Sequence, residues 1–77
     1  MMWIRSQYKE ILTNCNVFYI DEINSSYTIE GNIGVLGSYS TKEKAMKVLD
    51  MLEEQIDYYS KENFYIVFQM PLDSEVE

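Results

Sequence analysis

A single segment of this 77-residue chain has the apolar periodicity of an α-helix. Along it, apolar side chains recur at helical spacing and form one stripe: Ala45, Val48, Leu49, Leu52 and Ile56. Ser40 and Glu43 have the spacing of a capping box, in which the serine accepts a backbone N–H and the glutamate reaches back. We therefore predict one helix, from about Thr41 to Tyr59.

The rest of the chain is rich in β-branched and aromatic residues, which favour strands. These residues lie between turn signals and predict strands at 2–8, 17–23, 27–30, 33–39 and 64–68. Asn24-Ser25-Ser26 and Gly31-Asn32 are the predicted tight turns. Segment 9–16 has no clear pattern, because Ile11 and Leu12 fit either the start of a strand or a short loop.

The element order ββββαβ predicts the α+β class, with a single, mainly antiparallel sheet and one helix packed on one face. We expect one domain over residues 1–71, since Pro71 ends the last strand, and a loose acidic tail over 72–77. Strands 17–23 and 64–68 are apolar in both alternating phases, whereas one helix covers one face only. The uncovered face predicts a homo-oligomer.

The chain contains no histidine and one cysteine, Cys15. It therefore lacks the commonest general base and zinc ligand, and it has no partner for a disulfide within the chain. A lone thiol without a neighbouring histidine is typical of a buried packing residue in a reducing compartment. Because no nucleophile with an adjacent base and no cofactor motif is present, we expect no catalytic residues, no metal and no cofactor.

Acidic residues outnumber basic ones by thirteen to six, which gives a net charge of −7. Binding to nucleic acid requires clustered lysine and arginine, and the chain has a single arginine, so no direct contact with nucleic acid is expected. No apolar stretch has the length of a signal peptide or a membrane span. The predicted location is the cytoplasm of a bacterial host cell, with no membrane partner.

The first candidate site is cationic and lies around the predicted helix start. A helix N-terminus offers free backbone N–H groups to an anion such as phosphate, although the glycine spacing here is not that of a Walker loop. Arg5 lies between Trp3 and Gln7 on the first strand and could grip an anion, or equally pair with a neighbouring carboxylate. The predicted ligand-binding residues are Arg5, Gln7, Ser40, Thr41, Lys42 and Lys44.

The second candidate site is acidic and lies on the outer face of the same helix: Asp50, Glu53, Glu54 and Asp57. These acids crowd the negative end of the helix dipole, which costs a few tenths of a kcal/mol per charge (about 0.3). They could meet a basic protein surface. The alternatives are simple solvation, or a divalent ion, for which the spacing does not match a calcium loop.

Three stretches of the chain together resemble a group of small proteins encoded by phages, prophages and mobile elements of low-GC Gram-positive bacteria. They are Trp3-Ile4-Arg5-Ser6-Gln7, the segment from Gly37 to Met51, and Phe68-Gln69-Met70-Pro71. The resemblance spans nearly the whole chain, with 11–34 matching least, and it brings no activity and no site residue. By analogy of context, it implies a counter-defence factor.

These observations together predict a non-catalytic, oligomeric binding protein. The first hypothesis is that it sequesters a small anionic, nucleotide-like signal molecule between subunits through the cationic residues. The alternative hypothesis is an acidic inhibitor that blocks a basic surface of a host defence protein or a nucleic-acid-binding protein. The two hypotheses differ in sign, because the first requires the cations to converge and the second requires the acids to form a continuous stripe.

Overall fold

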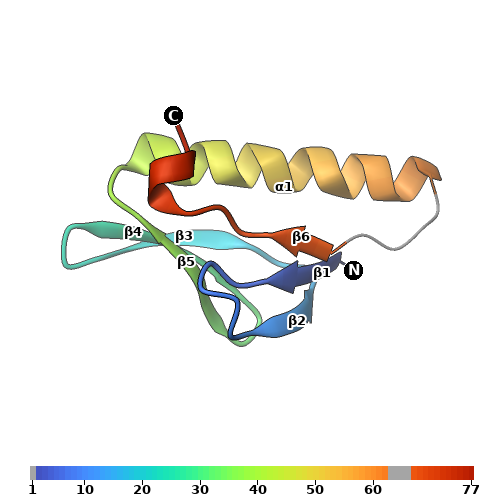
Figure 1. Cartoon of the computed structure of the whole chain (residues 1–77), viewed down its shortest axis with the longest axis horizontal. Coiled ribbons are helices and arrows are strands. Elements are labelled where there is room, and N and C mark those ends of the chain that lie inside the picture. The colour runs from blue at the N-terminus through green and yellow to red at the C-terminus, as the bar shows by residue number, and fades with distance from the viewer. Residues whose placement is uncertain (1, 63–66) are drawn as a thin grey trace.

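The computed structural model describes residues 2–62 and 67–77 of the chain. The described residues form an α+β domain with six strands, one α-helix and one short 3₁₀ helix (Figure 1). The elements are β1 (Met2–Arg5), β2 (Leu12–Cys15), β3 (Tyr19–Ile23), β4 (Ser26–Gly31), β5 (Gly34–Tyr39), α1 (Lys42–Glu62), β6 (Val67–Gln69) and η1 (Asp73–Glu75). The predicted α+β class is confirmed.

The strands form two three-stranded sheets, and the prediction of one sheet is wrong. Sheet A has the order β2-β1-β6, and sheet B has the order β3-β4-β5. In sheet A, β1 is antiparallel to β2 but parallel to β6, so that Trp3 pairs with both Asn14 and Val67. This parallel pairing brings the last strand back to the first. Because β2 and β6 take up the two sides of β1, strand β1 does not pair with the antiparallel strands β3, β4 and β5.

Strand β2 is the element that the sequence pattern did not predict, and it changes the order to βββββαβ. Its side chains do alternate, since Thr13 and Cys15 are buried while Leu12 is exposed. The buried positions, however, are held by a small polar residue and a thiol, and the leucine faces outward. An apolar periodicity therefore gives no signal here.

The predicted hairpin turn at Asn24-Ser25-Ser26 is confirmed, and the second turn lies one residue later than predicted, at Asn32 and Ile33. Asn24 and Ser25 have φ angles of 49° and 65° and join Ile23 to its partner Ser26. Two central residues with positive φ match the twist of the flanking strands, which is why asparagine favours this position. The next hairpin closes at the pair formed by Gly31 and Gly34, where Gly34 has a φ of 134° that residues with a side chain rarely adopt.

Helix α1 extends along one side of the molecule above both sheets (Figure 1). Its apolar stripe closes a single core, to which both sheets contribute: Met2, Ile4, Cys15, Ile29, Leu36, Tyr39, Ala45, Val48, Leu52, Phe68, Met70 and Val76. Fully burying a leucine or isoleucine side chain stabilises a fold by roughly 1.5–3 kcal/mol. Cys15 is a free, buried thiol within this core, in agreement with the predicted packing role.

The helix begins one residue later than the predicted capping box requires. Thr41 Oγ1 accepts the backbone N–H of Lys44 at 3.2 Å, so Thr41, and not Ser40, is the capping residue. Ser40 is engaged elsewhere, with Asp73. The helix then continues to Glu62, beyond its predicted end.

Residues 72–77 pack against the domain, so the expectation of a loose tail is wrong. Asp73–Glu75 form a 3₁₀ turn, and the side chain of Val76 is 7% exposed within the core. In Figure 1 this segment, drawn in red, lies beside the start of α1. A buried valine anchors the segment, and its acidic residues are thereby brought to the helix N-terminus.

Candidate functional site

The start of helix α1 binds an anion, and that anion is a carboxylate of the chain itself. Asp73 Oδ1 accepts the backbone N–H of Ser40 at 2.8 Å and its hydroxyl at 3.1 Å. Lys44 Nζ donates to the backbone oxygen of Asp73 at 3.0 Å and lies 3.4 Å from Oδ2. Two of the residues that were expected to hold a ligand, Ser40 and Lys44, are therefore engaged by Asp73.

These contacts favour the charged form of Asp73. The backbone N–H of Ser40 is the main cause that lowers the pKa of this carboxyl below its ordinary value, and the Ser40 hydroxyl and Lys44 lower it further. Lys47 Nζ donates to the backbone oxygen of Glu77, so a second lysine of the helix is bonded to the same segment. Residues 72–77 thus bond two lysines of the helix, and Asp73 places one negative charge at the helix start.

The side chain of Gln7 lies inside the protein, although it was expected on one sheet face with Trp3 and Arg5. Strand β1 ends at Arg5, and the chain then turns so that Gln7 is 4% exposed. Its Nε2 donates to the backbone oxygens of Ser38 and Pro71, each at 3.1 Å. Its Oε1 accepts the backbone N–H of Ser38 at 3.0 Å. The amide therefore joins three chain segments, and both of its N–H donors are used within the protein.

Tyr39 reinforces the same junction. Its hydroxyl donates to the backbone oxygen of Pro71 at 2.8 Å, which Gln7 also contacts. Burial, followed by the nearby charges of Asp73 and Glu75, raises the pKa of Tyr39 well above its usual range. The tyrosine therefore stays neutral and acts as a structural donor.

The outward face of sheet A carries Arg5 among apolar side chains. Cross-strand pairing places Trp3 beside Val67 and Asn14, and Arg5 beside Leu12 and Gln69. Trp3, Leu12 and Val67 are exposed. Within the described part of the chain, the side chain of Arg5 forms neither a hydrogen bond nor an ion pair, so the carboxylate partner considered for it is not found there.

Of the six predicted ligand-binding residues, two have side chains without such a partner in the described ranges: Arg5 on β1 and Lys42 at the start of α1. The other four, Gln7, Ser40, Thr41 and Lys44, are all bonded within the protein. The structure thus does not bring the six residues together as an open anion pocket.

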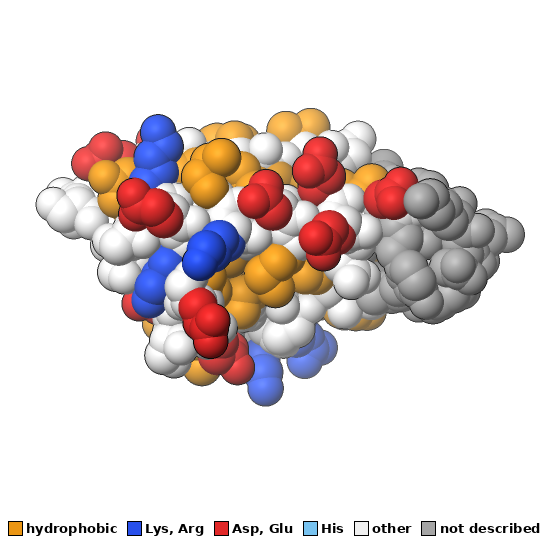
Figure 2. All heavy atoms as spheres, turned by 90° about the horizontal axis from the view of Figure 1, so that it is seen from above, with side chains coloured by type: hydrophobic (Ala, Val, Ile, Leu, Met, Phe, Trp, Pro, Cys, Tyr) orange, Lys and Arg blue, Asp and Glu red, His pale blue; other side chains and the backbone are white. Residues whose placement is uncertain are grey.

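The acidic residues, by contrast, do form one surface. Asp50, Glu53, Glu54 and Asp57 are all exposed on α1. Figure 2 shows this side of the molecule, on which acidic side chains follow the helix and hydrophobic side chains lie between them. Met46 and Met51 contribute exposed apolar surface to the same helix. We call this surface the acidic helix face.

A third feature, which the sequence did not predict, is a hollow between the β1–β2 loop and strand β5. Its volume is about 240 Å³. It is lined by Ser6, Gln7, Tyr8, Glu10, Ile11, Val35, Leu36, Gly37 and Ser38. These residues come from two segments far apart in the chain, and no local pattern predicts that they meet.

Comparisons of the chain with models of protein families, with curated protein sequences and with solved structures found no significant match. The function is therefore argued from the residues of the chain itself. In the ranges that the structure describes, no helix is long and apolar enough to cross a membrane. Nor do three acidic or cysteine side chains of those ranges lie close enough together to hold a metal ion.

Proposed function

We propose that this protein is a non-catalytic binding protein whose acidic helix face docks on a basic surface of another protein. The carrying observation is the row of four exposed acidic residues along α1, which we call the acidic stripe and between which hydrophobic side chains lie (Figure 2). Its acids stand apart from the lysines at the helix start, two of which are bonded to residues 72–77. The stripe thus presents negative charge that a cationic partner would neutralise.

Physical chemistry favours such a partner in two ways. Like charges three or four positions apart on a helix repel one another, as the four acids of this face do, and a basic surface would offset this repulsion. Complementary charge also accelerates encounter and rejects partners of the wrong sign. The exposed side chains of Met46 and Met51 add adaptable apolar contact beside the acids.

The resemblance to phage-encoded proteins favours a host defence protein or a nucleic-acid-binding protein as the partner, because such proteins often present basic surfaces.

Self-association remains part of the proposal. Tyr19 and Val67 lie on the two sheets, and both leave about half of the side chain exposed, at 49% and 54%. Val17, which precedes β3, is also exposed, at 56%. A second copy would remove such apolar surface from water.

Capture of a small anion is the second candidate, and the observation that favours it is Arg5. Arg5 shares the outward face of β1 with Trp3, whose side chain is exposed, and a guanidinium on the same face as an indole suits a phosphate or a base edge. In an oligomer, Arg5 and Lys42 of different subunits could approach one ligand. A nucleotide that raises the melting temperature, but does not do so in Arg5→Ala, would favour this candidate.

Binding of a synthetic helical peptide of leucine and lysine tests the leading proposal. We expect Glu53→Gln/Glu54→Gln to weaken this binding by about tenfold, which corresponds to losing roughly 0.7 kcal/mol at each of two exposed charges. Asp21→Asn/Glu22→Gln removes the same charge from strand β3 and serves as the matched control. Added salt should weaken the wild-type complex.

The proposal requires that the peptide bind to the acids of the helix face and not to negative charge elsewhere on the protein. Equal weakening by both double variants would mean that only net charge matters, and it would overturn the helix face as the docking surface. Binding of a leucine and glutamate peptide with the same affinity would overturn the basic partner.

A further inference from the structure

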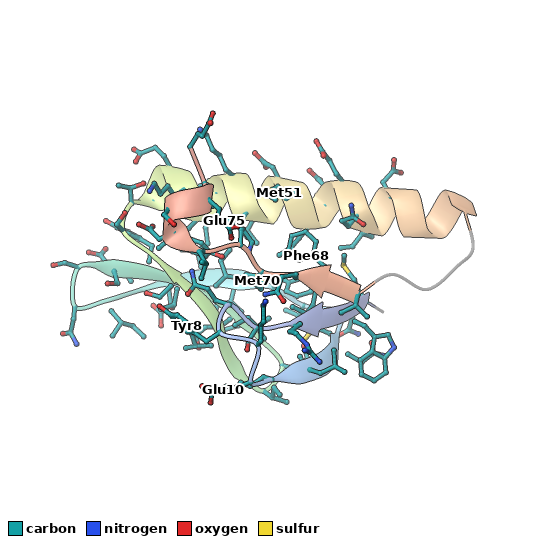
Figure 3. All side chains as sticks on the ribbon, in the orientation of Figure 1. Tyr8, Glu10, Met51, Phe68, Met70 and Glu75 are labelled. Carbon is teal, nitrogen blue, oxygen red and sulfur yellow. The ribbon has the colours of Figure 1, made fainter. Side chains whose placement is uncertain are left out.

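The hollow between the β1–β2 loop and β5 lies apart from the acidic helix face. In Figure 3 its residues Tyr8 and Glu10 lie on the side of the molecule away from α1. Its walls are mainly apolar, formed by Tyr8, Ile11, Val35 and Leu36. Tyr8 is 74% exposed and Val35 is 44% exposed, so two large apolar side chains border the opening. Such surface around a concavity is typical of a binding site.

The walls of this hollow are held in place by backbone hydrogen bonds. Within the loop, the N–H of Ser6 donates to the oxygen of Ile11 at 2.8 Å, and the N–H of Ile11 donates to the Ser6 hydroxyl at 3.1 Å. The N–H of Gln7 donates to the oxygen of Leu36 at 2.8 Å and fastens the loop to β5. A site fixed before binding loses little entropy when it is filled.

The size of the hollow identifies the kind of occupant. Its 240 Å³ lies below the range of roughly 300–1,000 Å³ that is common for small-molecule sites. A hollow of this size suits one large side chain. Interfaces between proteins are often anchored by one aromatic or aliphatic residue in such a pocket.

The charge of the lining indicates which residues would lie next to the inserted side chain in the partner protein. Glu10 is the one charged residue among those that line the hollow, and its side chain has no hydrogen bond or ion pair within the described ranges. The adjacent Lys9 is not part of the lining. The chain as a whole carries −7. A lysine or arginine beside the anchor would therefore be favoured over an acid.

We propose that this hollow is an anchor pocket for a partner protein, which inserts one apolar or aromatic side chain flanked by a basic residue. The pocket goes beyond the docking role of the acidic helix face. It is defined by different residues, and it stands even if that face binds nothing.

A titration of the full, ¹⁵N-labelled chain with acetyl-Lys-Trp-Lys-amide tests the pocket by NMR. We expect saturable shifts at the amides of Gly37 and Ser38, with a dissociation constant of about 1 mM for so small a probe. Acetyl-Lys-Gly-Lys-amide and acetyl-Glu-Trp-Glu-amide are the matched controls for the anchor and for the charge. Both should bind at least about tenfold more weakly.

Variants locate the binding. Glu10→Gln should weaken the complex by about threefold, and Val35→Lys should abolish it, whereas Ile23→Lys at the exposed end of β3 should leave it intact. Tyr8→Ser replaces an exposed loop side chain and should also weaken the binding, so the pocket stays testable if Val35→Lys does not fold. Absence of saturable shifts, equal binding of the glycine or glutamate peptide, or shifts confined to α1 would each overturn the pocket.

Discussion

The two charged regions of helix α1 differ in the structure, although the sequence presents each as a candidate binding surface. At the helix start, lysines and hydroxyl groups are satisfied by residues 72–77, above all by Asp73. On the outer face, carboxylates remain exposed to solvent along the helix (Figure 2). The difference teaches that a charge cluster indicates a binding surface only after the contacts made by distant parts of the chain are known.

This contrast depends on the junction that holds residues 72–77 in place. Gln7, Ser38, Tyr39 and Pro71 meet there through side-chain hydrogen bonds to the backbone. If the junction failed, Asp73 would leave the helix start and the two regions would resemble each other. Breaking the junction is therefore the strongest way to break the comparison.

The largest expected effect belongs to Gln7→Ala. The substitution removes a buried amide and leaves the N–H and oxygen of Ser38 and the oxygen of Pro71 without this partner. Loss of such bonds should lower the free energy of unfolding by about 3 kcal/mol. For a domain of this size that is a fall in melting temperature of roughly 12–24 °C, measurable by calorimetry.

Gln69→Ala is the matched control for this prediction. Gln69 also donates to backbone oxygens, those of Ser6 and Met70, but unlike Gln7 it is exposed, at the end of β6. We expect it to cost about 1 kcal/mol or less. Equal losses for the two variants would contradict the special role given to Gln7.

The same residue illustrates what can be predicted from the sequence. Helix α1 and the hairpin turn at Asn24 and Ser25 follow from local periodicity and turn chemistry, and both were predicted. The inward turn of Gln7, the parallel pairing of β1 with β6 and the contact of Asp73 with Ser40 join residues more than thirty positions apart. No local pattern encodes such contacts, so the sheet order and the helix-start site could not be derived.

The acidic helix face could be predicted in part from the sequence. Its exposure follows from the helical stripe alone, since Asp50 and Asp57 lie opposite the buried Val48 and Leu52. The hollow beside β5 lies at the other extreme. Its walls at Tyr8 and Val35 meet only because a loop is bonded across a strand.

The second prediction concerns the pH at which the helix start loses its internal anion. The pKa of Asp73 is lowered in the folded state, so its stabilising contribution is fully present above its ordinary unfolded value of about 4. The contribution is lost as the pH falls through the lowered folded value. Asp73→Asn should therefore be less stable than wild type at pH 7, and this gap in melting temperature should close in acid.

Ser40→Ala sharpens this measurement. The backbone N–H of Ser40 is the main cause of the lowered pKa and survives the substitution, whereas the hydroxyl does not. The pH dependence should therefore be reduced but retained. A gap between wild type and Asp73→Asn that is the same at neutral and acidic pH would contradict the assignment of Asp73 as the anion of the helix start.

The smallest expected effect is on the stability of Glu53→Gln/Glu54→Gln. Neither carboxylate has a hydrogen bond or an ion pair within the described part of the chain, and both lie three or four positions from Asp50 and Asp57, where like charges repel. Their neutralisation should leave the free energy of unfolding unchanged or raise it by about 0.5 kcal/mol, as read from urea denaturation. A loss of more than about 1 kcal/mol would instead assign these acids to the fold, as with Asp73, and would remove the difference between the two regions on which the docking proposal depends.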